Sequence, residues 1–500
     1  MLETHTIGSK VPPATNTFPN NDYINLLSIF KVYYPYTLPN MTYKIKLSRM
    51  LAPVLLSGFF LTSSPQTLAQ EAVRQDGEIK QMVNQLSAQN LEQLVQKMVS
   101  FGTRHSLSTT TSKKEGIGAA REWVKSEFEK YAKTSGGRMT VEMDRYTVKA
   151  DGRRIPQDVE MANVMATLKG TDPNDDRVII VGGHLDSRVT DVMDAKSKAP
   201  GANDDASGVA MVMEMARVMA SKQFPATLVF VAFQGEEQGL YGSKHLADRA
   251  KKENWNLVAM LNNDIVGNSY SAETGLHNNT TVRVFSEGIP VNETEEQARL
   301  RRTLGAENDS PSRNLARYME NVGERYVDQI DVVMVHRADR FLRGGDHTPF
   351  NQNGFAAVRM SETNEDFDHQ HQDIRKEDGK QYGDLIEYMD FEYLRKNTGV
   401  NLATMASLAW APAAPDKVSV LTADLTNTTQ LQWEAPAKGE KPAGYYVLMR
   451  ETNSPAWEKK FFVKDTKADI NYSKDNYFFA VQAVDAEGHA SLPVLPVPVR

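Results

Sequence analysis

Three short, unbroken apolar segments constrain the fold of this chain more than any other feature. They lie within the expected strands Arg177–Gly182, Thr227–Phe233 and Leu257–Leu261. Unbroken apolar runs of this length are typical of strands that are buried on both faces of a parallel sheet. Helix-forming sequence separates the runs, and strands that alternate with helices form α/β domains. We therefore expect an α/β fold in which helices flank a central, mostly parallel sheet.

Further segments extend this domain on both sides of the three runs. Apolar residues recur at helical spacing before the runs, and alternating or apolar stretches indicate additional strands. A domain of about 310 residues is thus expected over residues 101–410, preceded by a helical segment over residues 70–100. The expected elements are a helix at Ile117–Ala132, strands at Met139–Val148 and Glu160–Lys169, an exposed polar excursion at Asn292–Arg313 and a closing helical segment at Asp384–Trp410.

A second, all-β module is expected after the linker Ala411–Pro415. Short strands with turn residues between them follow, which is typical of a β-sandwich of one small module over residues 416–500. Trp433, Tyr446 and the run Tyr477–Gly488 resemble a fibronectin type III domain. The resemblance implies a spacer, or a module that binds another protein or a polysaccharide. The expected strands are Val418–Leu421, Thr429–Trp433, Gly444–Arg450, Trp457–Val463 and Tyr477–Val484.

The first 69 residues contain the pattern of a secretory signal peptide. Basic residues precede the apolar run Leu51–Leu61, and Thr67–Ala69 resembles a cleavage site. The run is too short to span a bilayer, so we expect no stable membrane span in the mature chain. The signal would occupy residues 41–69, and residues 1–40 would be an upstream extension. The alternatives are a membrane anchor or a genuine pre-extension. We expect an exported protein, either periplasmic or secreted.

The charge of the chain argues against a nucleic-acid partner. The formal net charge is −7, and no basic stripe interrupts the sequence. The chain contains no cysteine, so neither a disulfide framework nor a thiolate metal site is available.

Side chains that can bind metals follow each of the three apolar runs. The first run is followed by a histidine and an acid, and the other two by further acids. Ligands of open α/β sheets bind beyond the carboxyl ends of the strands, so these side chains should meet. One more acid lies in the turn-forming segment Pro200–Gly208, which precedes an apolar helix. The candidate residues are His184, Asp186, Asp204, Glu236, Glu237 and Asp264.

Buried carboxylates this close together repel one another unless a cation compensates them. Oxygen and imidazole ligands without sulfur suit Zn²⁺, Co²⁺ or Mn²⁺. The acids exceed what one tetrahedral zinc needs, and they suit two metals that share a bridging carboxylate. A second histidine should come from later in the chain. The candidates are His336, His347, His369 and His371, and the turn-rich approach Arg343–Asp346 favours His347.

Five motifs in this order resemble a zinc peptidase family. The family contains bacterial leucyl aminopeptidases and glutamate carboxypeptidase II, with transferrin receptor as an inactive relative. The resemblance runs from about Gly102 to Trp410. The motifs are His184-x-Asp186, Gly201–Gly208, Glu236-Glu237, Asn263-Asp264 and Asp346-His347.

The resemblance implies a role for each matching residue. Asp204 would bridge two zinc ions, with His184 and Asp264 on one ion and Glu237 and His347 on the other. Glu236 would be the general base that takes a proton from a metal-bridged water and passes it to the leaving amine. Asp186 would hold the far nitrogen of His184. The peptide bond after the bridging Asp204 would be cis.

The chain departs from the family pattern at one position. Several relatives have Tyr immediately before the final histidine ligand, whereas this chain has Asp346, which cannot stabilise an oxyanion. Either another donor substitutes, or Asp346 supports His347. Arg343 and Arg359 would supply positive charge or form structural ion pairs. The segment His369–Gln372 is read as a hydrogen-bonded loop, with a third metal locus or a pocket wall as alternatives.

The sequence thus predicts an exported two-zinc exopeptidase that removes N-terminal residues from peptide substrates. A carboxypeptidase or dipeptidase of the same family is the first alternative, and Arg343 or Arg359 directed into the pocket would favour it. A glutaminyl cyclase is disfavoured because those enzymes keep one metal. A non-catalytic adhesion or receptor protein is the alternative from another class, and the retained Glu236 argues against it.

Overall fold

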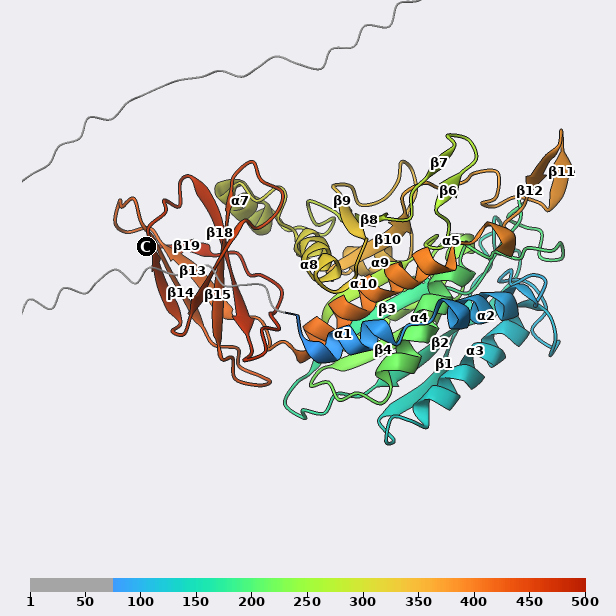
Figure 1. The fold of residues 1–500 in the computed structure, drawn as a ribbon, viewed down its shortest axis with the longest axis horizontal. Coiled ribbons are helices and arrows are strands. Elements are labelled where there is room, and N and C mark those ends of the chain that lie inside the picture. The colour runs from blue at the N-terminus through green and yellow to red at the C-terminus, as the bar shows by residue number, and fades with distance from the viewer. Residues whose placement is uncertain (1–74) are drawn as a thin grey trace, which may run out of the picture. The chain divides into compact units, whose positions relative to one another are not determined.

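The computed structural model describes residues 75–500 (Figure 1). The predicted signal peptide and upstream extension therefore lie outside the described residues. In the described part, no helix has the length and apolar character needed to cross a bilayer.

An eight-stranded sheet forms the centre of the first domain, with the order β1-β2-β4-β3-β5-β10-β8-β9. The pairs β4–β3, β3–β5, β5–β10 and β8–β9 are parallel, and the other three pairs are antiparallel. The predicted α/β fold is confirmed, and the three apolar runs are the adjacent strands β4, β3 and β5. The strands are β1 (Met139–Val148), β2 (Val159–Leu168), β3 (Arg177–His184), β4 (Thr227–Phe233), β5 (Asn256–Asn263), β8 (Thr281–Phe285), β9 (Asp331–Val335) and β10 (Ala357–Glu362).

Helices cover both faces of this sheet (Figure 1). On one face the main core packs a set of helices against the strands, and α4 is buried along nearly its whole length. Asp205 caps α4 because its side chain accepts a hydrogen bond from the Gly208 amide. These helices are α1 (Gly77–Asn84), α2 (Ala88–Val99), α3 (Gly116–Ala132), α4 (Ala206–Met219), α8 (Pro311–Tyr326) and α10 (Phe391–Trp410).

A second apolar cluster joins the opposite face to α6 (Tyr241–Lys252) and α9 (His347–Gln352). The buried residues that these two helices contribute are Leu246 and Ala247 of α6 and Phe350 of α9. The remaining elements are short or peripheral. They are α5 (Glu236–Gly239), α7 (Glu295–Leu304), the 3-10 turn η1 (Ile386–Tyr388), and the hairpins β6 (Tyr270–Ser271) with β7 (Leu276–His277) and β11 (Arg375–Glu377) with β12 (Lys380–Tyr382).

The C-terminal module consists of two antiparallel-rich sheets with the orders β17-β14-β13-β19 and β16-β15-β18. Inward side chains of both sheets, among them Trp433, Val447 and Phe479, form one core. All five strands expected from the sequence are present, whereas β17 and β19 were not expected. The resemblance to a fibronectin type III domain stays a prediction. The strands are β13 (Asp416–Leu421), β14 (Thr429–Glu434), β15 (Gly444–Glu451), β16 (Lys459–Val463), β17 (Lys467–Ile470), β18 (Tyr477–Val484) and β19 (Val497–Val499).

The C-terminal module packs on α8 through a buried charge cluster. Arg317 of α8 and Arg450 of β15 both bind Asp309, at 2.9 and 2.7 Å. The Tyr318 hydroxyl donates to the Ala490 carbonyl at 2.8 Å. We call Asp309, Arg317 and Arg450 the Asp309 cluster.

Candidate metal centre

The predicted ligands meet at the carboxyl edge of the central strands. His184 ends β3, Glu237 follows β4, and Asp264 follows β5. These strands are neighbours in the sheet, so their ends lie side by side. Asp204 comes from the loop before α4, and its peptide bond to Asp205 is cis, as the resemblance implies.

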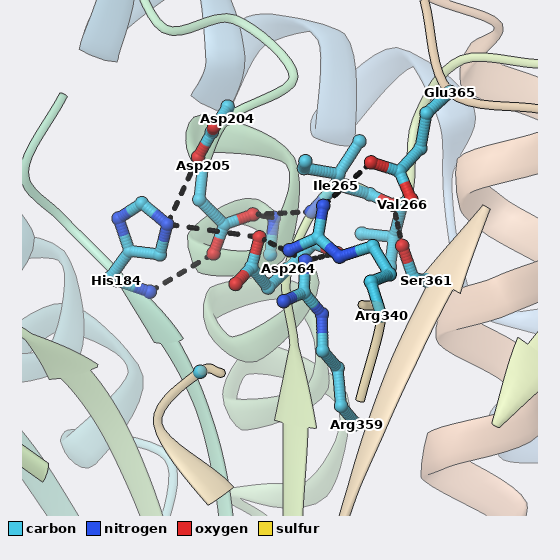
Figure 2. A network of polar contacts seen from close by, with 12 residues as sticks. His184, Asp204, Asp205, Asp264, Ile265, Val266, Arg340, Arg359, Ser361 and Glu365 are labelled. Carbon is cyan, nitrogen blue, oxygen red and sulfur yellow. Dashed lines mark hydrogen bonds and ion pairs between the residues drawn. The ribbon is translucent and has the colours of Figure 1, made fainter. Parts of the chain in front are cut away.

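The donor atoms form two sets that share Asp204. His184 Nε2 lies 3.0 Å from Asp204 Oδ1 and 3.9 Å from Asp264 Oδ1 (Figure 2). His371 Nε2 lies 2.9 Å from Asp204 Oδ2 and 3.0 Å from Glu237 Oε1. The two oxygens of Asp204 thus face different histidines. We call these five residues the donor cluster.

The donor cluster fits divalent cations. In each set, one imidazole nitrogen and two carboxylate oxygens lie within 4.8 Å of one another. Ligands that share a tetrahedral zinc with bonds near 2.0 Å lie about 3.3 Å apart, which is close to the shortest separations here. The set His184, Glu236 and Glu237 satisfies the same criterion and overlaps the other two.

The electrostatics of the donor cluster reflect an excess of carboxylates. Burial lowers the pKa of His371, but Glu237 and Asp204 outweigh burial and raise it to about 10. Burial also lowers the pKa of His184, yet its hydrogen bonds to Asp204 and Asp264 hold it well above the usual range. The carboxylates thus favour positive charge on both imidazoles, and divalent cations would supply that charge in their place.

His347 does not lie in the donor cluster, which corrects the predicted ligand set. Its side chain is buried, and its Nε2 lies 2.9 Å from the Ala338 carbonyl oxygen and 3.7 Å from Asp339. His371, one of the four candidates, occupies the expected place. The loop that follows β10 carries His371 back over Asp204, and local sequence patterns do not encode such a path.

Asp186 also differs from its predicted contact. Its backbone carbonyl, at 2.9 Å, contacts His184 Nδ1, while its carboxylate is 3.8 Å away. The carboxylate instead accepts hydrogen bonds from the backbone amides of Gly235, Glu236 and Glu237 at 3.0–3.3 Å. Asp186 therefore positions the segment that carries the predicted base as well as the imidazole of His184.

The remaining predicted residues separate into structural and cavity-lining groups. Arg359 is fully buried and binds Asp264 at 2.9 Å (Figure 2). It also binds Asp339 at 3.3 Å, so it is an ion-pair partner. Arg343 is exposed and lines the cavity above the donor cluster. Asp346 is buried, and burial raises its pKa to about 7. It makes no side-chain cap bond to α9.

Two residues that sequence reasoning missed support the donor cluster. Asp384 accepts hydrogen bonds from the amides of Asn203 and Asp204, the latter at 2.7 Å. Burial raises the pKa of Asp384 to about 7. Arg104 is buried and donates to the carbonyls of Leu185 and Gly201 at 2.7 and 2.9 Å. No motif signals either residue, because each acts through backbone groups of distant segments.

Gln370 takes the position before the final histidine that Asp346 was expected to hold. Its amide donates to Asp204 Oδ2 at 3.3 Å, and its side chain lines the cavity. The neutral amide is a donor, whereas a carboxylate at this position would repel a developing oxyanion.

Known proteins are similar in sequence to this chain over most of its length. A probable zinc metalloprotease of Leptosphaeria maculans is 46% identical over 422 residues, which cover 84% of this chain and 97% of the relative. A probable zinc metalloprotease of Pyricularia oryzae is 44% identical, with 87% of this chain and 88% of the relative covered. Residues 163–388 match Peptidase family M28.

The chain belongs to peptidase family M28. This confirms the family resemblance found in the motifs. Among solved structures, LapA of Legionella pneumophila is similar with 21% identity, a TM-score of 0.49, and coverage of 68% of this chain and 78% of LapA. The family identifies the chain as a zinc-dependent peptidase.

Proposed function

We propose that this M28 peptidase is a two-zinc exopeptidase that removes N-terminal residues from peptides. The observation that carries the proposal is the pair of donor sets that share Asp204, each with one histidine and one further acid. A bridging carboxylate that presents one oxygen to each set suits two ions better than one. Co²⁺ or Mn²⁺ would fit the same oxygen and nitrogen donors.

The chain's own residues provide the remaining chemistry. Zinc ions bound in the donor cluster would polarise the scissile carbonyl and lower the pKa of an attacking water. Glu236 lines the cavity beside the donor cluster without belonging to the two sets that share Asp204. Its carboxylate would take a proton from the water and deliver it to the leaving amine. Three consecutive hydrogen bonds from this segment to Asp186 hold Glu236 in place.

Gln370 is proposed to replace the tyrosine of several relatives. Its amide nitrogen lies at the cavity wall next to Asp204, where it would donate to the carbonyl oxygen as negative charge develops.

A carboxypeptidase or dipeptidase is the second candidate, and one observation favours it. Arg343 lines the cavity, as this alternative requires, whereas Arg359 is buried in ion pairs. A non-catalytic receptor would need neither Glu236 nor a complete donor cluster. Export to the periplasm or the medium, peptide partners, and a binding role for the C-terminal module remain parts of this proposal that rest on sequence alone.

The test compares one peptide that has a free N-terminus with its N-acetylated twin, using zinc-loaded protein with and without a chelator. We expect chelator-sensitive release of the N-terminal residue from the free peptide only. Glu236→Gln is the control for contaminating peptidases. Cleavage of the acetylated twin from its C-terminal end would replace the aminopeptidase by the carboxypeptidase. No cleavage of either peptide by metal-replete protein would contradict both.

A further inference from the structure

The cavity above the donor cluster is lined by arginines as well as by acids. It has a volume of about 470 Å³. In the described residues, the acids that line it are Asp204, Glu236, Glu237 and Asp264. Four arginines line the same cavity, namely Arg154, Arg188, Arg340 and Arg343.

Three of the four arginines have no carboxylate partner within residues 75–500. Arg154 donates to the Glu237 carbonyl at 2.7 Å, and Arg188 donates to the carbonyls of Val189 and Thr190 at 3.0 and 2.9 Å. The guanidinium of Arg343 makes no hydrogen bond or ion pair within the described part of the chain. Arg340 is different, because Glu365 binds it at 2.6 Å (Figure 2).

The three unpaired arginines come from separate segments of the fold. Arg154 lies between β1 and β2, Arg188 lies in the loop after β3, and Arg343 lies between β9 and α9. Their convergence on one cavity is therefore a tertiary feature and does not follow from a periodic charged surface. Guanidinium groups bind carboxylates through paired, charge-assisted hydrogen bonds.

The acids of the cavity do not neutralise these arginines when the site is loaded. The proposed ions engage Asp204, Glu237 and Asp264 as ligands, and Glu236 serves as the base. The charge that remains to face a substrate is then that of the arginines. A substrate ammonium group finds no further carboxylate along this cavity in the described residues, whereas a substrate carboxylate finds three cations.

We propose that Arg154, Arg188 and Arg343 form a carboxylate-binding subsite, so that the enzyme acts on peptides with an anionic group next to the scissile bond. The inference rests on the proposed function and names its substrate class. The carboxylate is either the C-terminus of a short peptide or an acidic side chain. Both present the same group to the arginines, and the experiment separates them.

The test uses two isosteric peptide pairs. Leu-Leu and Leu-Leu-amide differ in the C-terminal carboxylate, while Glu-Leu-amide and Gln-Leu-amide differ in a side-chain carboxylate. Each peptide is titrated calorimetrically into zinc-loaded full-length Glu236→Gln protein, so that binding is measured without turnover. The values of kcat/KM are then measured with the unmodified protein, which keeps Glu236. We expect about tenfold tighter binding of the acid in one pair, and that pair identifies the source of the carboxylate.

Arginine variants distinguish the subsite from direct binding of the carboxylate to metal. The double variant Arg343→Gln with Arg188→Gln should weaken binding of the preferred acidic peptide by about tenfold, which abolishes the preference. Binding of the amides should not change. Matched controls are Arg153→Gln, next to Arg154, and Arg337→Gln, which stacks on Phe341 in the same loop as Arg343. Both should keep the preference.

Each outcome bears on one proposal. Equal binding within both pairs, or a preference that the arginine variants leave unchanged, would overturn the subsite. A carboxylate preference in the calorimetry without cleavage of any peptide would support the subsite and contradict the exopeptidase. Cleavage of neutral and acidic peptides at equal rates would support the exopeptidase and contradict the subsite.

Discussion

The donor cluster and the Asp309 cluster are both buried groups of charges, yet they are built in opposite ways. Asp309 receives Arg450 on both carboxylate oxygens and Arg317 on one, at 2.7–2.9 Å. The donor cluster instead sets three carboxylates against two histidines, with Arg359 bound only to Asp264 among them.

The difference distinguishes buried charges that stabilise the fold from buried charges that bind a ligand. Every oxygen of Asp309 is satisfied by permanent cations, so this cluster needs nothing from solution. The donor cluster depends on ions that solution must supply, and its geometry is kept by backbone contacts from Asp186 and Asp384. Changes in the first region should therefore alter stability, and changes in the second should alter chemistry.

The largest expected effect is a loss of activity without a loss of stability, caused by a change at the single residue Glu236. Glu236→Gln should lower kcat by about a thousandfold, because a general base contributes roughly that factor. Its zinc content and melting temperature should match those of the unmodified protein. The measurements are steady-state kinetics, metal analysis and calorimetry on one preparation. A variant with near-normal kcat would remove Glu236 from the mechanism.

The second prediction compares two histidines. His371→Ala should lose one of two bound zinc ions and lower activity by about a hundredfold or more, because it removes a direct ligand. His347→Ala should keep both ions, since His347 contacts Ala338 and lies outside the donor cluster. Metal analysis after dialysis tests this difference. Loss of zinc from His347→Ala with retention in His371→Ala would restore the ligand set expected from the sequence.

A third prediction concerns the Asp309 cluster. Arg450→Ala removes a partner of a fully buried carboxylate and should lower the free energy of unfolding by about 3 kcal/mol. Activity per folded molecule should not change. Lys438→Ala is the matched control, because Lys438 also joins the C-terminal module to the first domain but pairs with Asp176 at an exposed position. It should have little effect on urea unfolding. Equal effects of the two changes would contradict the distinction.

The smallest expected effect concerns Glu287, a buried acid outside both clusters. Burial raises the pKa of Glu287 to about 7, above its ordinary value of 4.5. A raised carboxyl pKa stabilises the fold fully below the ordinary value, and this contribution is lost as pH rises through 7. Glu287→Gln should therefore melt a few degrees above the unmodified protein at pH 8 and equally at pH 4. The exposed Glu295→Gln should show no such pH-dependent difference.

Sequence patterns were sufficient to predict those site residues that directly follow a buried strand. The apolar runs of β3, β4 and β5 indicated their positions, and the residues after them indicated the edge at which His184, Glu237 and Asp264 meet. Strands β8, β9 and β10 were not predicted. They are short, and β10 includes the buried Arg359, which breaks the apolar pattern that marks the other central strands.

Loop paths explain the errors in the predicted site. His347 and His371 both follow turn-forming sequence, and only the packing of residues 363–374 across Asp204 decides between them. The family resemblance implied a side-chain contact between Asp186 and His184. The chain direction turns the carbonyl toward the imidazole instead and leaves the carboxylate to the amides after β4. These side-chain orientations depend on backbone segments that are distant in the sequence, so the spacing of residues along the chain does not predict them.

The two histidines of the donor cluster differ in their access to water, and this bears on how fast each ion would exchange. The His184 side chain is 1% exposed, whereas that of His371 is 23% exposed. A ligand on an accessible loop detaches without unfolding the sheet, while His184 ends a central strand. A chelator should therefore withdraw the ion at His371 first. Between the two steps the protein would hold one ion, with Asp204 bound to a single metal.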